Sequence, residues 1–147
     1  MDVQKTLVKS LDLVFKENNF KKKVNHWYFY WELILKINLQ KSYYGDVFYI
    51  NLDIFFNNWE KNYFPNYPQQ FSTRLDHILT NLRIEKEFRF EWLTEKEIND
   101  KINYISLLIK DNINILKDLS NIDQFKKYIN TNKNYLLSSE LKNKLNT

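Results

Sequence analysis

The chain has 147 residues, of which 44% are hydrophobic and 17% aromatic, and it carries a formal net charge of +4. This length and apolar content predict one folded domain, residues 1–147, with a single core, and they exclude a disordered chain. Because the chain has one glycine and no cysteine, a glycine-rich phosphate-binding loop, a disulfide framework and a thiolate nucleophile are excluded as well.

The composition also indicates where the protein acts. No apolar run approaches the roughly twenty residues of a membrane-spanning helix, and the N-terminal residues lack the apolar core of a secretory signal. We therefore expect a cytoplasmic protein that makes no membrane contacts. The lysines are spread among many Asn, Ile and Tyr residues, a combination typical of an AT-rich bacterial genome. The positive charge alone therefore does not identify a polyanionic partner.

The chain begins with a predicted amphipathic helix and continues into β-strands. In the first segment, apolar residues recur at helical spacing with charged residues between them. They are Val3, Leu7, Leu11, Val14 and Phe15. Aromatic and branched residues over 27–31 and 33–39 then predict two strands with a tight connection near Trp31 and Glu32.

The single glycine predicts a β-hairpin. Gly45 lies between two segments that both alternate apolar and polar residues with a period of two. A turn over Tyr43–Asp46 gives the register that matches polar residues with polar residues. The expected opposed pairs are Lys36 with Asp53, Asn38 with Asn51, and Gln40 with Tyr49.

We expect the Lys36–Asp53 pair to be exposed and weak, so that Asp53→Ala costs only about 0.2–1 kcal/mol. A loss of several kcal/mol would instead mean that this polar face of the hairpin is buried. Asn38, Gln40 and Asn51 would then become candidates for an internal hydrogen-bond network or a ligand pocket.

After the hairpin the chain is predicted to form a loop and two further strands. Residues 57–70 hold both prolines among Asn, Tyr and Gln, which indicates an irregular loop. A fourth strand is expected within residues 71–82. A fifth is expected over 85–92, because period-two alternation continues through this segment. One face of this fifth strand would hold Lys86, Phe88, Phe90 and Trp92.

The last third of the chain is predicted to be helical. The segment Thr94-Glu95-Lys96-Glu97 matches a capping box and predicts the start of a long helix that ends near Ser120. The apolar stripe of this helix is Ile98, Ile102, Ile105, Ile109, Ile113 and Leu116. Two shorter helices are expected, one over Ile122–Ile129 and one that carries Leu137, Leu141 and Leu145. The whole pattern predicts an α+β domain: an N-terminal helix, an antiparallel sheet of about four to five strands, a long helix and two shorter helices.

Two groups of residues could support catalysis, and we favour a structural interpretation of both. His77 follows Asp76 and lies near Arg74, as a general base tuned by a carboxylate would, but no nucleophile accompanies it. The row of glutamates over Glu85–Glu91 resembles the two carboxylates of a glycosidase, but its alternation with aromatic residues indicates the solvent face of a strand. The two histidines lie far apart and have no cysteine nearby, so no metal site is expected. We therefore predict a protein that is not an enzyme and that holds no cofactor.

One lysine run raises the possibility of nucleic-acid binding. Lys21–Lys23 precede Trp27, Tyr28 and Tyr30, a mixture of cations and rings that resembles a site for single-stranded nucleic acid. Lysine runs are more often solvated loops, and strand aromatics are more often core residues. We keep nucleic-acid binding as the alternative function.

The aromatic residues of the proline-containing loop favour a protein partner instead. They are Trp59, Tyr63, Phe64 and Tyr67. Tyr and Trp residues on an irregular segment are typical of protein interfaces, and together with Arg74 they form the predicted partner-binding set. If these rings close the edge of the core instead, Trp59→Ala and Tyr63→Ala would lower the melting temperature by several degrees.

Several pieces of the first half resemble one known family. In chain order they are Phe20-Lys21-Lys22, Trp27-Tyr28, Asn38-Leu39-Gln40-Lys41-Ser42 and Tyr49-Ile50-Asn51-Leu52. Over roughly residues 5–80, their order and spacing are similar to those of a bacterial family catalogued only as domain of unknown function 4304. The chain departs from the family pattern at Asn19, where the family favours Gly, and at Gln70, where the family has a His before the Arg that matches Arg74.

The resemblance implies a small α+β fold and brings no established activity. If the missing His does chemistry in relatives, this chain lacks that chemistry. Small bacterial domains without catalytic residues are often immunity proteins, which bind and block a partner toxin, and from this analogy of class we expect a protein-binding module. Because the chain is basic, such a toxin would be a non-nuclease or would present an acidic face.

Overall fold

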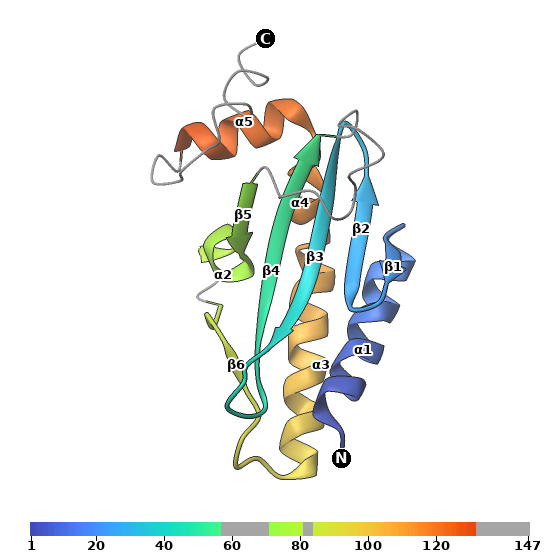
Figure 1. Ribbon diagram of the computed structural model, residues 1–147, viewed down its shortest axis with the longest axis vertical. Helices are drawn as coiled ribbons and strands as arrows, with labels where there is room; N and C mark the ends of the chain where they lie inside the picture. Colours follow the sequence, from blue (N-terminus) through green and yellow to red (C-terminus); the bar gives the residue numbers. More distant parts are fainter. Residues whose placement is uncertain (57–70, 81–83, 132–147) are drawn as a thin grey trace.

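The computed structural model describes residues 1–56, 71–80 and 84–131, and the structural statements below concern these residues. They form an α+β fold (Figure 1), as the sequence predicts. The helices are α1 (Val3–Glu17), α2 (Leu75–Ile78), α3 (Glu95–Asp111), α4 (Ile113–Asp118) and α5 (Ile122–Thr131). The strands are β1 (Lys21–Lys23), β2 (His26–Tyr30), β3 (Leu33–Lys41), β4 (Val47–Phe56), β5 (Phe71–Arg74) and β6 (Phe88–Arg89). The predicted loop over 57–70 and the predicted helix around Leu137–Leu145 lie outside the described residues.

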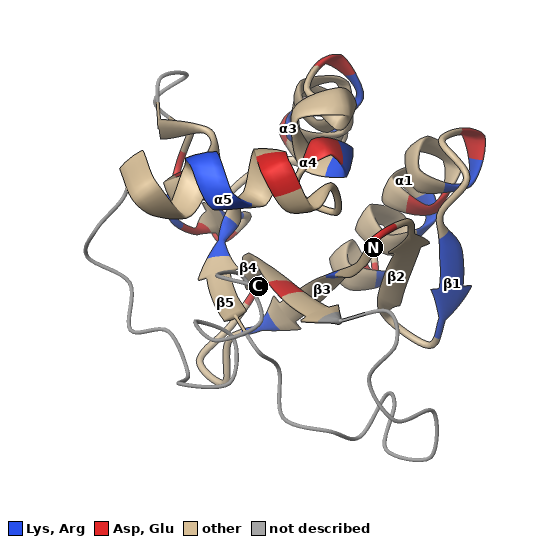
Figure 2. Ribbon diagram, turned by 90° about the horizontal axis from the view of Figure 1, so that it is seen from above, with Lys and Arg blue, Asp and Glu red and all other residues tan. Residues whose placement is uncertain are grey.

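The strands form one antiparallel sheet with the order β1-β2-β3-β4-β5, and β6 pairs with the start of β4. The predicted hairpin register is confirmed, since Lys36 lies opposite Asp53, Asn38 opposite Asn51 and Gln40 opposite Tyr49. Figure 2 shows α1, α3, α4 and α5 on one side of the sheet. We call the opposite side the outer face.

The main core lies between the sheet and the helices. Each strand points alternate side chains toward the helices, so the predicted apolar rows of β3 and β4 become buried on that side. The predicted stripe of α1 is buried as a whole, from Val3 to Phe15. Trp27 is also buried, and its indole donates a hydrogen bond to Asp12 on α1 (3.1 Å). A second, smaller buried cluster lies on the outer face and consists of Tyr28, Ile34 and Phe55.

The end of α1 is shaped by one left-handed residue. Asn19 donates from its backbone N to Lys16 O (3.3 Å), and Phe20 donates to Phe15 O (2.9 Å), the two bonds of a Schellman motif. Asn19 has a φ of 68°, which Gly adopts without steric cost and which Asn tolerates better than most residues. The rings of Phe15 and Phe20 then pack with their centroids 5.0 Å apart. The Gly that the resemblance implies at this position would adopt the same conformation without steric cost.

Asn19→Gly is expected to raise the free energy of unfolding by up to about 1 kcal/mol, because Gly lacks the Cβ that disfavours the left-handed conformation. Asn19→Ala should lower it by about 1 kcal/mol for the same reason. Urea denaturation of the three proteins measures both differences. If the Ala variant were as stable as the wild type, the turn would not depend on a left-handed residue.

The two strands predicted after the hairpin are shorter than expected. The fourth, β5, ends at Arg74, because the chain continues into the short helix α2. The fifth, β6, holds only Phe88 and Arg89. Phe88 and Phe90 are buried as predicted, but the placement of Trp92 on the same apolar face is wrong. Its φ of 65° ends the extended backbone and turns the indole into solvent.

The capping box of α3 is confirmed, but the helix ends earlier than predicted. Thr94 Oγ1 accepts a hydrogen bond from Glu97 N, and the Glu97 carboxylate accepts one from Thr94 N. The expected single helix to Ser120 is wrong, because it breaks at Asn112, whose side chain donates to Leu108 O (2.8 Å). Such a side-chain bond to the preceding turn competes with helix continuation. The apolar stripe nevertheless stays buried across the break.

Within the described residues, no helix combines the length and the apolar character that crossing a bilayer requires.

Candidate protein-binding site

Two turns meet at one end of the sheet, the hairpin turn after β3 and the turn between β6 and α3. Phe90 N donates a hydrogen bond to Asp46 O (2.9 Å) and joins them. Gly45 has a φ of 151°, and a Cβ at this position would clash with the Glu91 carboxylate. The backbone conformation therefore favours Gly at residue 45, and any other residue would also require the Glu91 side chain to move.

These two turns carry three aromatic side chains that project into solvent. We call them the aromatic tip: Tyr43, Tyr44 and Trp92. Their exposed fractions are 101%, 94% and 98%. Side chains as exposed as in an extended peptide bury no apolar area, so none of the three stabilises the fold. Single exposed apolar residues are ordinary, but three exposed aromatic residues on two turns that touch each other indicate a contact surface.

The backbone beneath Trp92 is held in place on both sides. Phe90 is buried and makes an edge contact with Phe48, with ring centroids 5.7 Å apart. Thr94 is fixed by the capping box. Between these anchors Trp92 adopts the left-handed conformation, which costs a non-glycine residue about 1–2 kcal/mol. Backbone strain of this kind occurs preferentially at functional sites.

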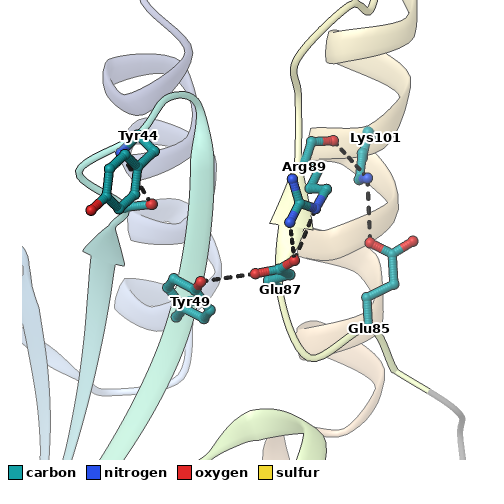
Figure 3. A network of polar contacts seen from close by, with 7 residues as sticks. Tyr44, Tyr49, Glu85, Glu87, Arg89 and Lys101 are labelled. Atoms are coloured by element: carbon teal, nitrogen blue, oxygen red, sulfur yellow. Dashed lines mark hydrogen bonds and ion pairs between the residues drawn. The ribbon is translucent and has the colours of Figure 1, made fainter.

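A polar network fastens the β6 segment to the sheet and to α3 (Figure 3). Tyr49 donates to Glu87 (2.8 Å), and Arg89 donates to the same carboxylate from Nε (2.8 Å) and Nη2 (2.6 Å). Lys101 donates to Arg89 O (2.8 Å) and pairs with Glu85 (3.3 Å). The base of the aromatic tip is therefore cross-linked by hydrogen bonds, while its rings project freely.

The network also gives a structural role to Glu87, one member of the glutamate row. The hydrogen bonds from Tyr49 and Arg89 lower the pKa of Glu87. A glycosidase acid needs the opposite, a raised pKa that keeps its proton at neutral pH. Glu87 anchors the β6 segment, but it precedes the two-residue strand and does not lie on the solvent face of a strand as predicted.

His77, the other candidate for catalysis, lies beside Thr73 and Asp76. His77 Nδ1 lies 3.2 Å from Thr73 Oγ1, and its Nε2 lies 3.7 Å from Asp76 Oδ2. Arg74 points elsewhere, with its guanidinium 4.5 Å from the centre of the Tyr49 ring. In the described part of the chain, no group of His, Asp and Glu residues is arranged to hold a metal ion.

The polar residues of the outer face are less exposed than expected. The side chains of Lys36 and Asp53 are only 16% and 10% exposed, with Nζ 3.9 Å from Oδ2, so the prediction of an exposed pair is wrong. Burial raises the pKa of Asp53, against the opposing effects of a hydrogen bond from Ser72 and the charge of Lys36. Asn51 donates to Gln40 (2.9 Å) in an exposed hydrogen bond.

His26 lies beside this pair and should make stability depend on pH. Burial, together with the charge of Lys36, lowers the pKa of His26 below its ordinary value of 6.5, while Asp53 opposes the shift. The fold therefore favours the neutral imidazole. Its contribution to stability is complete above about pH 6.5 and is lost as the pH falls toward the folded-state pKa.

His26→Gln is expected to flatten the decline of stability between pH 7 and pH 5, because Gln cannot take up the proton that the fold disfavours. Urea denaturation at intervals across this range gives the slope for each protein. Identical slopes for the variant and the wild type would show that His26 does not carry the effect.

The structure separates the remaining predicted site residues. The four loop residues Trp59, Tyr63, Phe64 and Tyr67 lie outside the described residues, and their role stays a prediction. Trp27 and Tyr28 are buried, so they offer no rings for stacking, whereas Lys21–Lys23 are exposed on β1. Sequence reasoning missed the aromatic tip, although the Tyr pair beside the single Gly was an available signal.

Comparison with known proteins gives one match. A family model described as a domain of unknown function, DUF4304, matches residues 11–131. The match extends the resemblance seen in the first half of the sequence through α5. No curated protein and no solved structure matches the chain.

Proposed function

Because this chain belongs to the DUF4304 family, whose description assigns no activity, we propose its function from its surface: a non-catalytic protein-binding module. The aromatic tip is its contact surface. Within that class we propose a bacterial immunity protein, which acts in the cytoplasm by binding and blocking a toxin domain. The immunity assignment rests on analogy with other small domains that lack catalytic residues.

The observation that supports protein binding is the exposure of Tyr43, Tyr44 and Trp92 on a cross-linked base. Tyr and Trp are the residues most enriched at the centres of protein interfaces. Each can bury about 150–250 Å² while few side-chain torsions become fixed. The strained but anchored backbone at Trp92 lowers the entropy cost of binding further, because the indole is already presented.

Nucleic-acid binding has weaker support. Lys21–Lys23 form an exposed basic strand, and Lys21 lies 5.8 Å from the centre of the Tyr30 ring. Trp27 and Tyr28, which would supply stacking rings beside these lysines, are 1% and 2% exposed. Of the predicted rings only Tyr30 is substantially exposed, at 44%. Cations beside so small a stacking surface give weak and salt-sensitive binding.

The test is complex formation with the product of the neighbouring gene, measured by calorimetry. The tip variant replaces Tyr43, Tyr44 and Trp92 by Ser. A matched control replaces three exposed apolar residues of α1 and α3 by Ser: Leu13, Tyr104 and Leu107, which are 60%, 59% and 56% exposed.

We expect the tip variant to lose binding and the control to keep it. The reverse pattern would move the interface to α1 and α3. Equal binding by all three proteins would refute the aromatic tip as the contact surface.

A further inference from the structure

A single row of opposed residues crosses five strands on the outer face. Its members, which we call the outer-face row, are Lys23, His26, Asn38, Asn51 and Arg74, each directly opposite the next. Directly opposed residues in antiparallel strands place their side chains on the same face. The row therefore presents two cations, an imidazole and two amides, and it contains no carboxylate.

The cations at the two ends of the row lack acidic partners within the described segments. Lys23 is exposed on the edge strand β1, and Arg74 is partly exposed on β5. The Arg74 guanidinium is held by stacking on the Tyr49 ring, with 4.5 Å to the ring centre. Stacking fixes the plane of the guanidinium while leaving its N–H donors available for a carboxylate.

Two acids near the row, Asp53 and Glu87, are already neutralised. Asp53 pairs with Lys36 beside the row. On the other side, Glu87 is bound by Arg89 and Tyr49. The charges of Lys23 and Arg74 are therefore not cancelled by these neighbours.

We propose that the outer-face row is a binding site for an extended acidic segment of a protein partner, which lies across the strands. Four gaps between strands of about 4.8 Å give a length of about 19 Å, which an extended peptide covers with about six residues. Arg74 binds a carboxylate at one end, Lys23 binds one at the other, and Asn38 and Asn51 bond the peptide between them. The site is separate from the aromatic tip and does not depend on it.

The row fits an acidic peptide better than a nucleic acid. Sheets that bind single strands stack bases on exposed aromatic rings. Here the Tyr49 ring is covered by Arg74, and Tyr28, which neighbours the row on β2, is buried. Tyr30 on β2 is 44% exposed, but it lies four residues from His26 and outside the row. The row itself offers amide and guanidinium donors, which match carboxylates.

The test uses the full chain and two labelled probes, octaglutamate and an eight-nucleotide oligothymidylate, with binding measured by fluorescence anisotropy. Octaglutamate is expected to bind more tightly than the oligonucleotide and to weaken as salt is added. Arg74→Gln should weaken octaglutamate binding about tenfold, because one charge-assisted fork is lost. Lys110→Gln removes the same charge from an exposed position on α3, and it should change binding less than about twofold, since the site is local.

Two further variants distinguish contacts made by the row from the general attraction of a basic protein for an acidic peptide. Asn38→Ala leaves the charge unchanged and should still weaken octaglutamate binding. Trp92→Ala should leave octaglutamate binding unchanged. A failure of the outer-face row can therefore be distinguished from a failure of the aromatic tip. Thermal melting confirms that each variant folds. Absent octaglutamate binding, or equal effects of Arg74→Gln and Lys110→Gln, would overturn the proposal. Tighter binding of the oligonucleotide would overturn it in favour of a nucleic-acid surface.

Discussion

Trp92→Gly is expected to weaken binding of the protein partner roughly 30-fold or more, the effect of losing a central aromatic anchor worth about 2 kcal/mol. The same substitution should not destabilise the fold. The indole is 98% exposed, so its removal leaves no cavity. Gly also adopts the left-handed backbone of this position without cost.

Calorimetric titration and thermal melting of the same variant separate binding from folding. The melting temperature should stay constant or rise, whereas affinity falls. Trp92→Ala is the matched control for the backbone, because it removes the ring and keeps the Cβ; its affinity should fall equally, without the gain in stability. A fall of several degrees in the melting temperature of both variants would show that Trp92 packs on the fold, and would remove it from the aromatic tip.

Lys36→Met is expected to lower the free energy of unfolding at pH 7 by about 3 kcal/mol, in the range found when one partner of a buried ion pair is removed. Both side chains of the pair are largely buried, so the Asp53 carboxylate would lose its counter-charge without regaining water. Met retains the apolar length of the Lys stem, which limits the loss of packing. Adding Asp53→Asn should restore most of the stability.

The difference in the free energy of unfolding between the wild type and the Lys36→Met variant should become smaller as the pH falls. Burial already raises the pKa of Asp53 above its ordinary value of 3.8, and removal of a nearby cation raises it further. A raised folded-state pKa means that the fold favours the neutral carboxyl, so relative stability returns as the pH falls through that pKa. Urea denaturation from pH 7 to pH 4 measures the effect. If the free energy of unfolding fell by less than about 1 kcal/mol at every pH, Lys36 and Asp53 would form a weak surface pair instead.

The amino-acid sequence by itself determined most of the secondary structure and the pairing of the central strands. The stripe of α1, the hairpin around Gly45 and the capping box at Thr94 all follow from residues close together in the chain. The spacing of apolar side chains and the residue types of turns and caps act at this short range. They can therefore be recognised from the sequence without knowledge of the fold. The α+β class followed from the order of these elements.

Only the tertiary structure decided which of these faces is buried and which residues meet. Alternation places Lys36 and Asp53 on one face, but their burial depends on surroundings that alternation does not encode. The five residues of the outer-face row come from five strands and align only when all registers are set.

The exposure of the aromatic tip also depends on tertiary contacts, and it was not predicted from the sequence. The alternation through Phe88 and Phe90 suggested that Trp92 belongs to the core. Contact between the two turns and the capped start of α3 fix the backbone on either side of this residue, and its left-handed conformation sends the indole outward. A local pattern predicts a side chain's direction only while the backbone stays regular, and here long-range packing ends that regularity.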